Sequence, residues 1–195
     1  MAYEGKARVL TNAEFMRAEK AAMLTRHGLR NKAMLYMSFA MALRACELRR
    51  LRIRDVLSPD GTLLEEINLL SRMTKAKKQR HVYLTNKKAR KVLMEYIDSI
   101  KKCAKWDDPL FKSQKGGEFL PSDIVRVFTN IFKLAGLANA RSHSGRRTFI
   151  TAKINDGFDI RHIAIMVGHE NINTTVGYHD ENPDILKKIA EHNIF

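Results

Sequence analysis

The sequence predicts a mainly α-helical domain of the α+β class that contains one small antiparallel β-sheet. Several stretches repeat apolar residues at spacings of three and four, which is typical of helices that bury one face. Two short runs, residues 63–73 and 80–84, are predicted instead to form paired strands. The length of 195 residues suits one domain, and no internal repeat or linker divides the chain.

The first predicted helix follows a leader of residues 1–10. Thr11 and Glu14 have the spacing of a capping box. The apolar face of this helix contains Phe15, Ala18, Ala22 and Met23. Residues 31–43 are apolar nearly all round, which predicts a helix at the centre of the core, and the methionines in it are assigned to packing because Met fills irregular gaps. A turn is expected at residues 58–61, where Pro fixes φ and Gly permits a positive φ.

Two further helices are predicted in the middle of the chain. Thr85 or Asn86 is expected to cap the first of them. Its apolar face contains Ala89, Val92, Leu93, Tyr96, Ile97 and Ile100. A polar connection, residues 101–120, leads to a second helix that starts at Ser122, after Pro121.

The C-terminal third is predicted to form short helical segments. Residues 141–179 contain three of them, separated by Asp156-Gly157 and by Gly168. Each Gly suits a helix C-cap, because it adopts the left-handed conformation at little cost. A last short helix is expected in residues 182–195.

The formal net charge of +14 indicates a polyanionic partner. Nucleic acid is the first expectation and an anionic membrane the second. The longest strongly apolar run, residues 33–43, is too short to span a bilayer, and residues 1–10 lack a secretory signal pattern, so we expect a cytoplasmic protein. Cys46 and Cys103 have no metal-type spacing, which suits free thiols in a reducing compartment and predicts neither a metal site nor a cofactor.

Six polar side chains supply the groups that metal-free cleavage of a phosphodiester needs. They are Arg44, Lys75, His143, Arg146, His169 and Tyr178. Guanidinium groups hold non-bridging oxygens, imidazoles donate hydrogen bonds or move protons, and a lysine protonates the leaving oxygen. A tyrosine hydroxyl, with an unperturbed pKa of about 10, becomes a usable nucleophile when cations surround it.

Each of these features also has a purely structural interpretation. Arg44 and Glu47 are three apart and can simply pair on a helix. Lysines 77 and 78 can serve only to protect a sheet edge from aggregation. A single histidine such as His169 can act as a helix-end cap.

Two sequence motifs in the first half resemble the catalytic domain of the tyrosine recombinases, also called the phage integrase family. The segment ALRACELRRL resembles the family's first arginine box, with Arg44 as the catalytic arginine and Glu47 as its acidic companion. The segment TKAKKQRHVYL is similar to the hairpin that carries the catalytic lysine. Register favours Lys75 for this role, with Lys77 or Lys78 as alternatives.

Two further motifs follow in the same order as in the family. SHSGRRTF resembles the His-x-x-Arg box, with His143 and Arg146. In VGHENINTTVGY, His169 stands nine residues before Tyr178, the family spacing between the second histidine and the nucleophile. The resemblance covers roughly residue 11 to the C-terminus.

The resemblance implies the DNA breaking-rejoining fold and a site-specific DNA recombinase or integrase. Tyr178 would attack the scissile phosphate and leave a 3′-phosphotyrosyl link and a free 5′-hydroxyl, without a metal or another cofactor. The partners would be double-stranded DNA, other copies of the chain in a tetramer on DNA, and accessory proteins. Residues 182–195 would dock on a neighbouring protomer, or alternatively fold back on their own domain.

Basic residues around these motifs are expected to contact DNA. They are Arg49, Arg50, Arg52, Lys77, Lys78, Arg80, Arg141 and Arg147. Gly145 stands where the family usually has an apolar residue, which predicts a looser backbone before Arg146. The few residues before the first helix predict no N-terminal core-binding domain in this chain, as in a minimal recombinase or a truncated one.

Three other functions remain open from the sequence. A DNA-binding regulator can retain the fold without turnover, and a type IB topoisomerase shares the same chemistry. A basic RNA-binding module ranks last, because the stacking aromatic residues typical of such domains are missing from the pattern.

Overall fold

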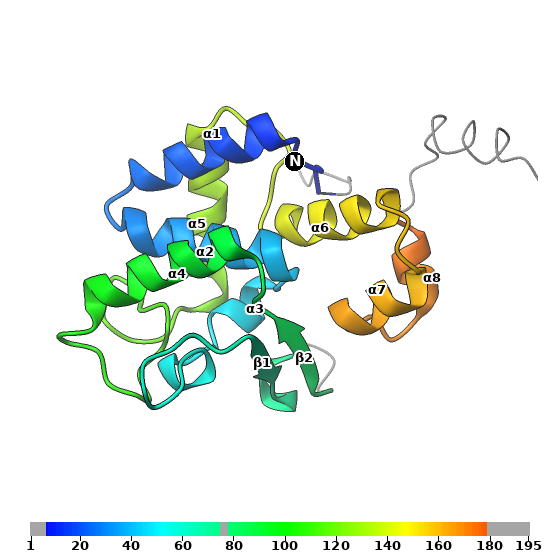
Figure 1. The fold of residues 1–195 in the computed structure, drawn as a ribbon. Helices are drawn as coiled ribbons and strands as arrows, with labels where there is room; N and C mark the ends of the chain where they lie inside the picture. Colours follow the sequence, from blue (N-terminus) through cyan, green and yellow to red (C-terminus); the bar gives the residue numbers. More distant parts are fainter. Residues whose placement is uncertain (1–6, 75–77, 179–195) are drawn as a thin grey trace, which may run out of the picture.

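The computed structural model describes residues 7–74 and 78–178, which form a mainly helical domain with one two-stranded sheet at its edge (Figure 1). The elements are α1 (Asn12–Met23), α2 (Gly28–Met41), α3 (Ala45–Leu48), η1 (Ile53–Asp55), β1 (Glu66–Leu69), η2 (Ser71–Met73), β2 (Arg80–Tyr83), α4 (Lys87–Ile100), α5 (Pro121–Leu134), α6 (Ser144–Asn155), α7 (Ile160–Val167) and α8 (Ile172–Val176). The predicted α+β class is confirmed. Lys75, Lys77 and residues 182–195, to which predictions were attached, lie outside the described residues.

The end of the chain segment before α1 is packed against the domain. Leu10 is buried, and its backbone N–H donates to Thr148 Oγ1 at 2.9 Å. The predicted capping box then begins α1: Thr11 Oγ1 accepts from the Glu14 N–H at 3.3 Å, and Glu14 Oε2 accepts from the Thr11 N–H at 3.0 Å. The last residue of the predicted leader thus contacts α6.

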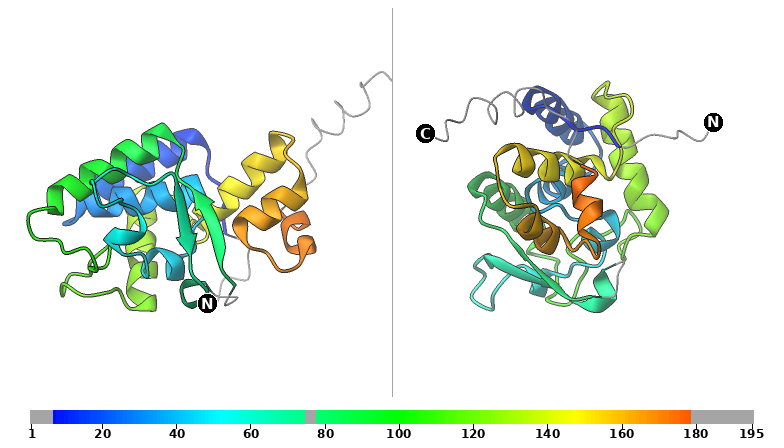
Figure 2. Two further views of the ribbon diagram at one scale, coloured as in Figure 1. Left: turned by 60° about the horizontal axis from the view of Figure 1, so that its bottom comes forward. Right: turned by 90° about the vertical axis from the view of Figure 1, so that its right-hand side faces the viewer.

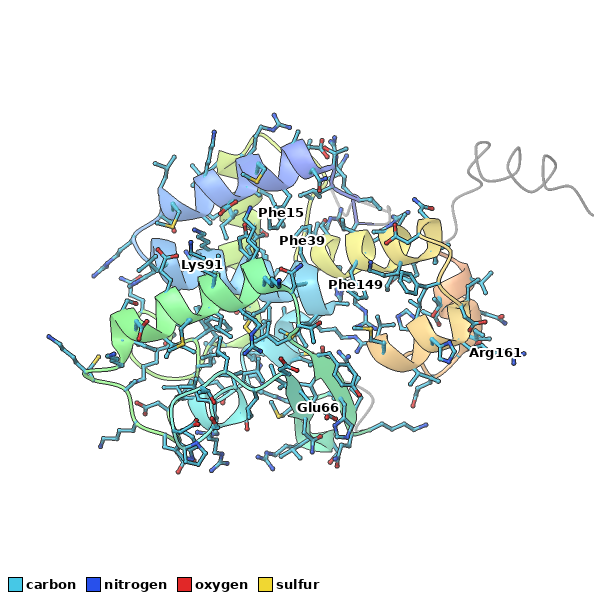
Figure 3. The ribbon with its side chains drawn as sticks, viewed as in Figure 1. Phe15, Phe39, Glu66, Lys91, Phe149 and Arg161 are labelled. Atoms are coloured by element: carbon cyan, nitrogen blue, oxygen red, sulfur yellow. The ribbon has the colours of Figure 1, made fainter. Side chains whose placement is uncertain are left out.

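Helix α2 lies at the centre of the molecule and packs against α1, α4 and α6. Its buried apolar side chains are Ala33, Met34, Leu35, Tyr36, Met37 and Met41, as the all-round apolar pattern predicts. Phe15 of α1 packs on Phe39 of α2, with ring centroids 4.9 Å apart (Figure 3). The helix ends at Met41, two residues before the predicted end, because Ala42 adopts a left-handed conformation with φ 53°.

The two strands pair antiparallel, with Leu69 opposite Arg80 and Glu66 opposite Tyr83. The first strand is shorter than the predicted residues 63–73, because the chain turns into η2 after Leu70. Alternation along β2 points Arg80 and Val82 inward and His81 and Tyr83 outward. The sheet thus buries an arginine at its start.

Helices α6, α7 and α8 lie together on one side of the molecule, with β2 beside α7 (Figures 1 and 2). They share a second, smaller core. Its buried members are Ala42, Ile150, Ile154, Ile163 and Val167, with Phe149 and Tyr178 packed against it. Gly157 and Gly168 end α6 and α7 with φ 84° and 66°, as predicted. None of the helices in the described ranges is long and apolar enough to cross a membrane.

Candidate functional site

A buried carboxylate organises one half of the site. Glu47 of α3 has a side chain that is 0% exposed. Its Oε1 accepts from Arg44 Nη1 at 3.0 Å, while Oε2 accepts from the Arg44 backbone N–H at 2.8 Å and from Arg80 Nη2 at 2.8 Å. The predicted pairing of Arg44 with Glu47 is therefore present, and it lies inside the protein rather than on a solvated helix face. Two guanidinium groups compensate one buried anion, as burial of a charge requires.

Arg44 connects this carboxylate to the C-terminal end of α7. It occupies the extended position just before α3, and its Nη2 donates to the Gly168 carbonyl at 3.4 Å. A cavity of about 590 Å³ opens beside it and is also lined by Lys78, Arg80 and His169. The cavity wall is therefore rich in cations, which suits an anionic ligand.

Arg146 is buried between α2 and α7. Its residue is only 2% exposed, with Nη1 donating to the Ala42 carbonyl at 2.9 Å and Nη2 to the Val167 carbonyl at 2.6 Å. Burial, followed by the nearby Arg44 charge, lowers the pKa of Arg146 to about 9. The guanidinium is still charged at neutral pH, and two carbonyls from distant segments fix its orientation.

Gly145 does not loosen the backbone before Arg146, which corrects the prediction. A Cβ at this position would lie 2.4 Å from Ser38 Oγ, 2.8 Å from Phe39 Cδ2 and 3.0 Å from the Ser38 carbonyl carbon. The glycine is therefore required where α6 crosses α2 at close range. Its missing side chain allows this approach and so positions Arg146 tightly.

His169 and Tyr178 lie against each other across α8. Their rings stack with centroids 5.7 Å apart and planes 19° apart. His169 Nδ1 is 2.8 Å from Oγ1 of Thr175, a residue that is completely buried. Burial, with the Arg146, Arg44 and Arg80 charges after it, lowers the pKa of His169 to about 4. The imidazole is therefore neutral at physiological pH, and Thr175 holds one of its two ring nitrogens.

His143 is exposed and lies just before α6. It lines a second cavity, of about 540 Å³, together with Arg141, Arg147 and Tyr178. Arg44 and His169 line the first cavity instead. The structure thus brings Arg44, Arg146 and His169 together around the end of α7, and Tyr178 connects this cluster to the cavity of His143. We use the name cation cluster for the six residues Arg44, Glu47, His143, Arg146, His169 and Tyr178.

The basic residues predicted to contact DNA differ in how deeply they are buried and in which groups they bind. Arg80 is largely buried: its side chain is 8% exposed and bound to Glu47, at the wall of the first cavity. Three others contact their own chain: Arg49 pairs with Glu118, Arg50 donates to the Arg72 carbonyl, and Arg52 donates to the Asp107 carbonyl.

The remaining predicted contacts border the cavities. Arg147 Nη1 donates to the Ala7 carbonyl at 2.9 Å, and Arg141 lines the cavity of His143. Lys78 is 75% exposed, with Nζ 3.6 Å from Glu170 Oε1. An exposed lysine at the mouth of the first cavity is in a suitable place to contact a phosphate.

Sequence reasoning missed the structural partners of the site. Thr175 and the carbonyl of Ala42 each hold a predicted catalytic side chain; both lie inside the quoted motifs, but neither was singled out as a partner. Arg80 was predicted only as a DNA contact, although Val82 and Leu84 are apolar at alternate positions after it. That alternation was a signal that Arg80 faces inward.

The arrangement suits a tetrahedral anion held close to a phenol. Two guanidinium groups, from Arg44 and Arg146, are fixed by protein acceptors, and each can direct remaining N–H donors toward non-bridging oxygens. The neutral imidazole of His169 is stacked on the Tyr178 ring and can accept or donate at Nε2. These are the components of nucleophilic attack on a phosphodiester.

Known proteins resemble this chain along most of its length. Residues 8–184 match the phage integrase family. The tyrosine recombinase XerC of Lactobacillus delbrueckii subsp. bulgaricus is 29% identical over 155 residues, which cover 77% of this chain and 50% of the relative. The chain spans about half the length of the curated relatives that it matches.

Solved structures agree with this similarity. XerA recombinase superposes with a TM-score of 0.77 and 26% identity, covering 100% of this chain and 66% of that one. XerH site-specific recombinase, bound to the palindromic difH substrate, has a TM-score of 0.74 and 22% identity, covering 96% and 53%. With the motifs, the helical fold and the match over residues 8–184 together, the chain belongs to the phage integrase family.

Proposed function

We propose that this domain is the catalytic part of a site-specific DNA recombinase that cuts and rejoins DNA through a 3′-phosphotyrosyl intermediate. The observation that carries the proposal is the meeting of Arg44, Arg146 and His169 around the end of α7, with the Tyr178 ring stacked on His169. The relatives named tyrosine recombinase support it.

In the proposed reaction, Tyr178 Oη attacks the scissile phosphorus. A tyrosyl O–P bond forms and the P–O5′ bond breaks, while Arg44 and Arg146 hold the non-bridging oxygens. The phenol proton passes to an imidazole, for which His143 and His169 are the proposed acceptors, and Lys75 supplies the proton that makes the 5′-hydroxyl. The number of P–O bonds is conserved, so the ester can be attacked by the 5′-hydroxyl of another duplex.

Rejoining to another duplex requires several protomers on DNA, and we propose a tetramer. XerH was crystallised bound to difH DNA, which supports duplex DNA as the partner here. Residues 182–195 are proposed to dock on a neighbouring protomer. The formal charge of +14 matches a phosphate-rich ligand.

A nicked suicide duplex tests the proposal. The probe carries an inverted repeat from the DNA that flanks the gene, with a nick placed so that the 5′-hydroxyl fragment diffuses away. We expect a covalent protein–DNA adduct that survives denaturing electrophoresis and that Tyr178→Phe abolishes, because phenylalanine has no nucleophilic oxygen. Tyr96→Phe is the matched control, since Tyr96 Oη donates to the Leu110 carbonyl in the core and its loss should leave the adduct.

Other outcomes identify the other functions. Tight binding of the duplex without an adduct would indicate a regulator that retains the fold. Relaxation of supercoiled plasmid without any required site would indicate an enzyme of the type IB topoisomerase kind.

A further inference from the structure

Arg80 is a buried arginine at which three of the four sequence motifs meet. It is the first residue of β2, directly after the lysine-bearing segment, and the register turns its side chain inward. Nη2 donates to Glu47 Oε2 at 2.8 Å, and Nη1 donates to the Met166 carbonyl at 2.6 Å. One guanidinium thus connects the hairpin, the first arginine box and the end of α7.

Arg80 also packs against the residue before His169. Gly168 has φ 66°, and a Cβ there would lie 2.6 Å from Arg80 Cδ and 3.1 Å from Nε. The carbonyl of the same glycine accepts from Arg44 at 3.4 Å. The Gly168 backbone is therefore held between two arginines, and its position sets where His169 begins.

The geometry needs a planar fork rather than a point charge. A lysine at position 80 could pair with Glu47 or reach the Met166 carbonyl, but it could not present two diverging N–H donors in fixed directions. The second cation on Glu47 has a further consequence. When Arg44 turns donors toward a phosphate, Arg80 still compensates the buried carboxylate, so Arg44 is not held back by an otherwise unpaired anion.

We infer that Arg80 is a positioning residue. It fixes Glu47, Arg44 and His169 in place relative to β2, the strand that follows the predicted catalytic lysine. The inference rests on the proposed recombinase function, because it deepens the same site. Arg80 acts through the residues that it holds, whereas the sequence suggested a direct contact with DNA.

The experiment compares variants of the full chain on the nicked suicide duplex. Arg80→Met removes the fork with little change in volume, Arg80→Lys keeps the charge, and Glu47→Gln with Arg80→Met removes both partners. Arg30→Met is the matched control. Arg30 is 8% exposed, as Arg80 is, and it also donates to a backbone carbonyl, that of Lys112, far from the cation cluster.

We expect Arg80→Met to lower the single-turnover cleavage rate by about 10²-fold, because misplacement of reacting groups by about 1 Å has an effect of this size. Duplex affinity should change little, since phosphate contacts dominate it. Arg80→Lys should recover part of the rate. The double variant should lose less than the sum of the losses in Glu47→Gln and Arg80→Met, because part of the effect of Arg80 passes through Glu47. Arg30→Met should cleave like the wild type once corrected for the folded fraction.

A second readout needs no activity. The His169 ring signals in NMR spectra of the DNA-free protein should shift in Arg80→Met and stay in place in Arg30→Met. Wild-type cleavage by Arg80→Met, additive losses in the double variant, or unmoved His169 signals would each overturn the inference. If the wild type forms no adduct, the recombinase proposal fails, and the NMR comparison still decides whether Arg80 positions the site.

Discussion

At the scale of single residues, burial among cations controls the protonation of His169. Desolvation is the main cause of its lowered pKa, and Arg146, Arg44 and Arg80 add to it. A histidine that stays neutral at physiological pH can accept a proton from a phenol, whereas an imidazolium cannot. A bound phosphate would oppose the three arginine charges and so favour the protonated form.

The lowered pKa predicts a pH-dependent loss of stability. The folded pKa of about 4 lies below the ordinary value of 6.5, so the unfolded chain takes up the proton first as the pH falls. The free energy of unfolding should therefore decrease from about pH 6.5 down to about pH 4. His169→Gln should make this decrease smaller, as measured by urea unfolding across the same pH range.

Two other histidines define the comparison. His27 also has a pKa lowered by burial, so part of the slope should remain in His169→Gln. His162 on α7 has a side chain that is 85% exposed, and His162→Gln is the control for replacing a histidine at the surface. An unchanged slope in His169→Gln would contradict the assignment of a strongly depressed pKa to His169.

At the scale of elements, the crossing of α6 over α2 positions the second arginine. Gly145 permits the contact, and Ala42 in its left-handed conformation presents a carbonyl to Arg146. A non-glycine residue with positive φ carries a backbone cost, which the packed surroundings must offset. The local cost is thus associated with a functional hydrogen bond.

Gly145→Ala should push the two helices apart. The added methyl would overlap Ser38 and Phe39, and overpacking of this kind costs about 1–3 kcal/mol. We expect a loss of that order in the free energy of unfolding, measured by urea denaturation. We also expect a lower cleavage rate, because Arg146 is the next residue. Gly117→Ala is the control, since nothing lies within 4 Å of a Cβ there. Equal stability of the two variants would refute the close crossing.

At the scale of the whole molecule, only part of the net charge of +14 is free to meet a ligand. Several arginines are engaged by their own chain, including Arg49, Arg50 and Arg52 near α3 and Arg80 and Arg146 in the interior. These arginines are therefore less available to phosphates than an exposed cation such as Lys78.

Duplex binding should weaken steeply with salt, because each neutralised phosphate releases condensed cations. Lys78→Gln at the mouth of the first cavity should reduce the slope of log affinity against log salt by about 0.9, the effect of one phosphate contact. Lys101→Gln is the matched control: Lys101 is also exposed and pairs weakly with Asp98 at 3.4 Å, beyond the end of α4. Fluorescence anisotropy at several salt concentrations measures both. Equal slopes for the two variants would exclude Lys78 from the DNA interface.

The sequence by itself determined the elements and the order of the motifs. The amphipathic pattern of α4, the capping box of α1 and the glycine ends of α6 and α7 are local properties, because periodicity and caps act over a few neighbouring residues. The same is true of the four motifs, which supported the family assignment before any geometry was known.

Only the tertiary structure decided how those motifs meet. Arg80 lay in a basic segment that suggests a surface, and its burial depends on the distant Glu47 and Met166. Gly145 suggested looseness, yet its role depends on how closely the α2 backbone approaches. Contacts between remote segments depend on packing and on the compensation of buried charge, and neither is encoded in the spacing of neighbouring residues.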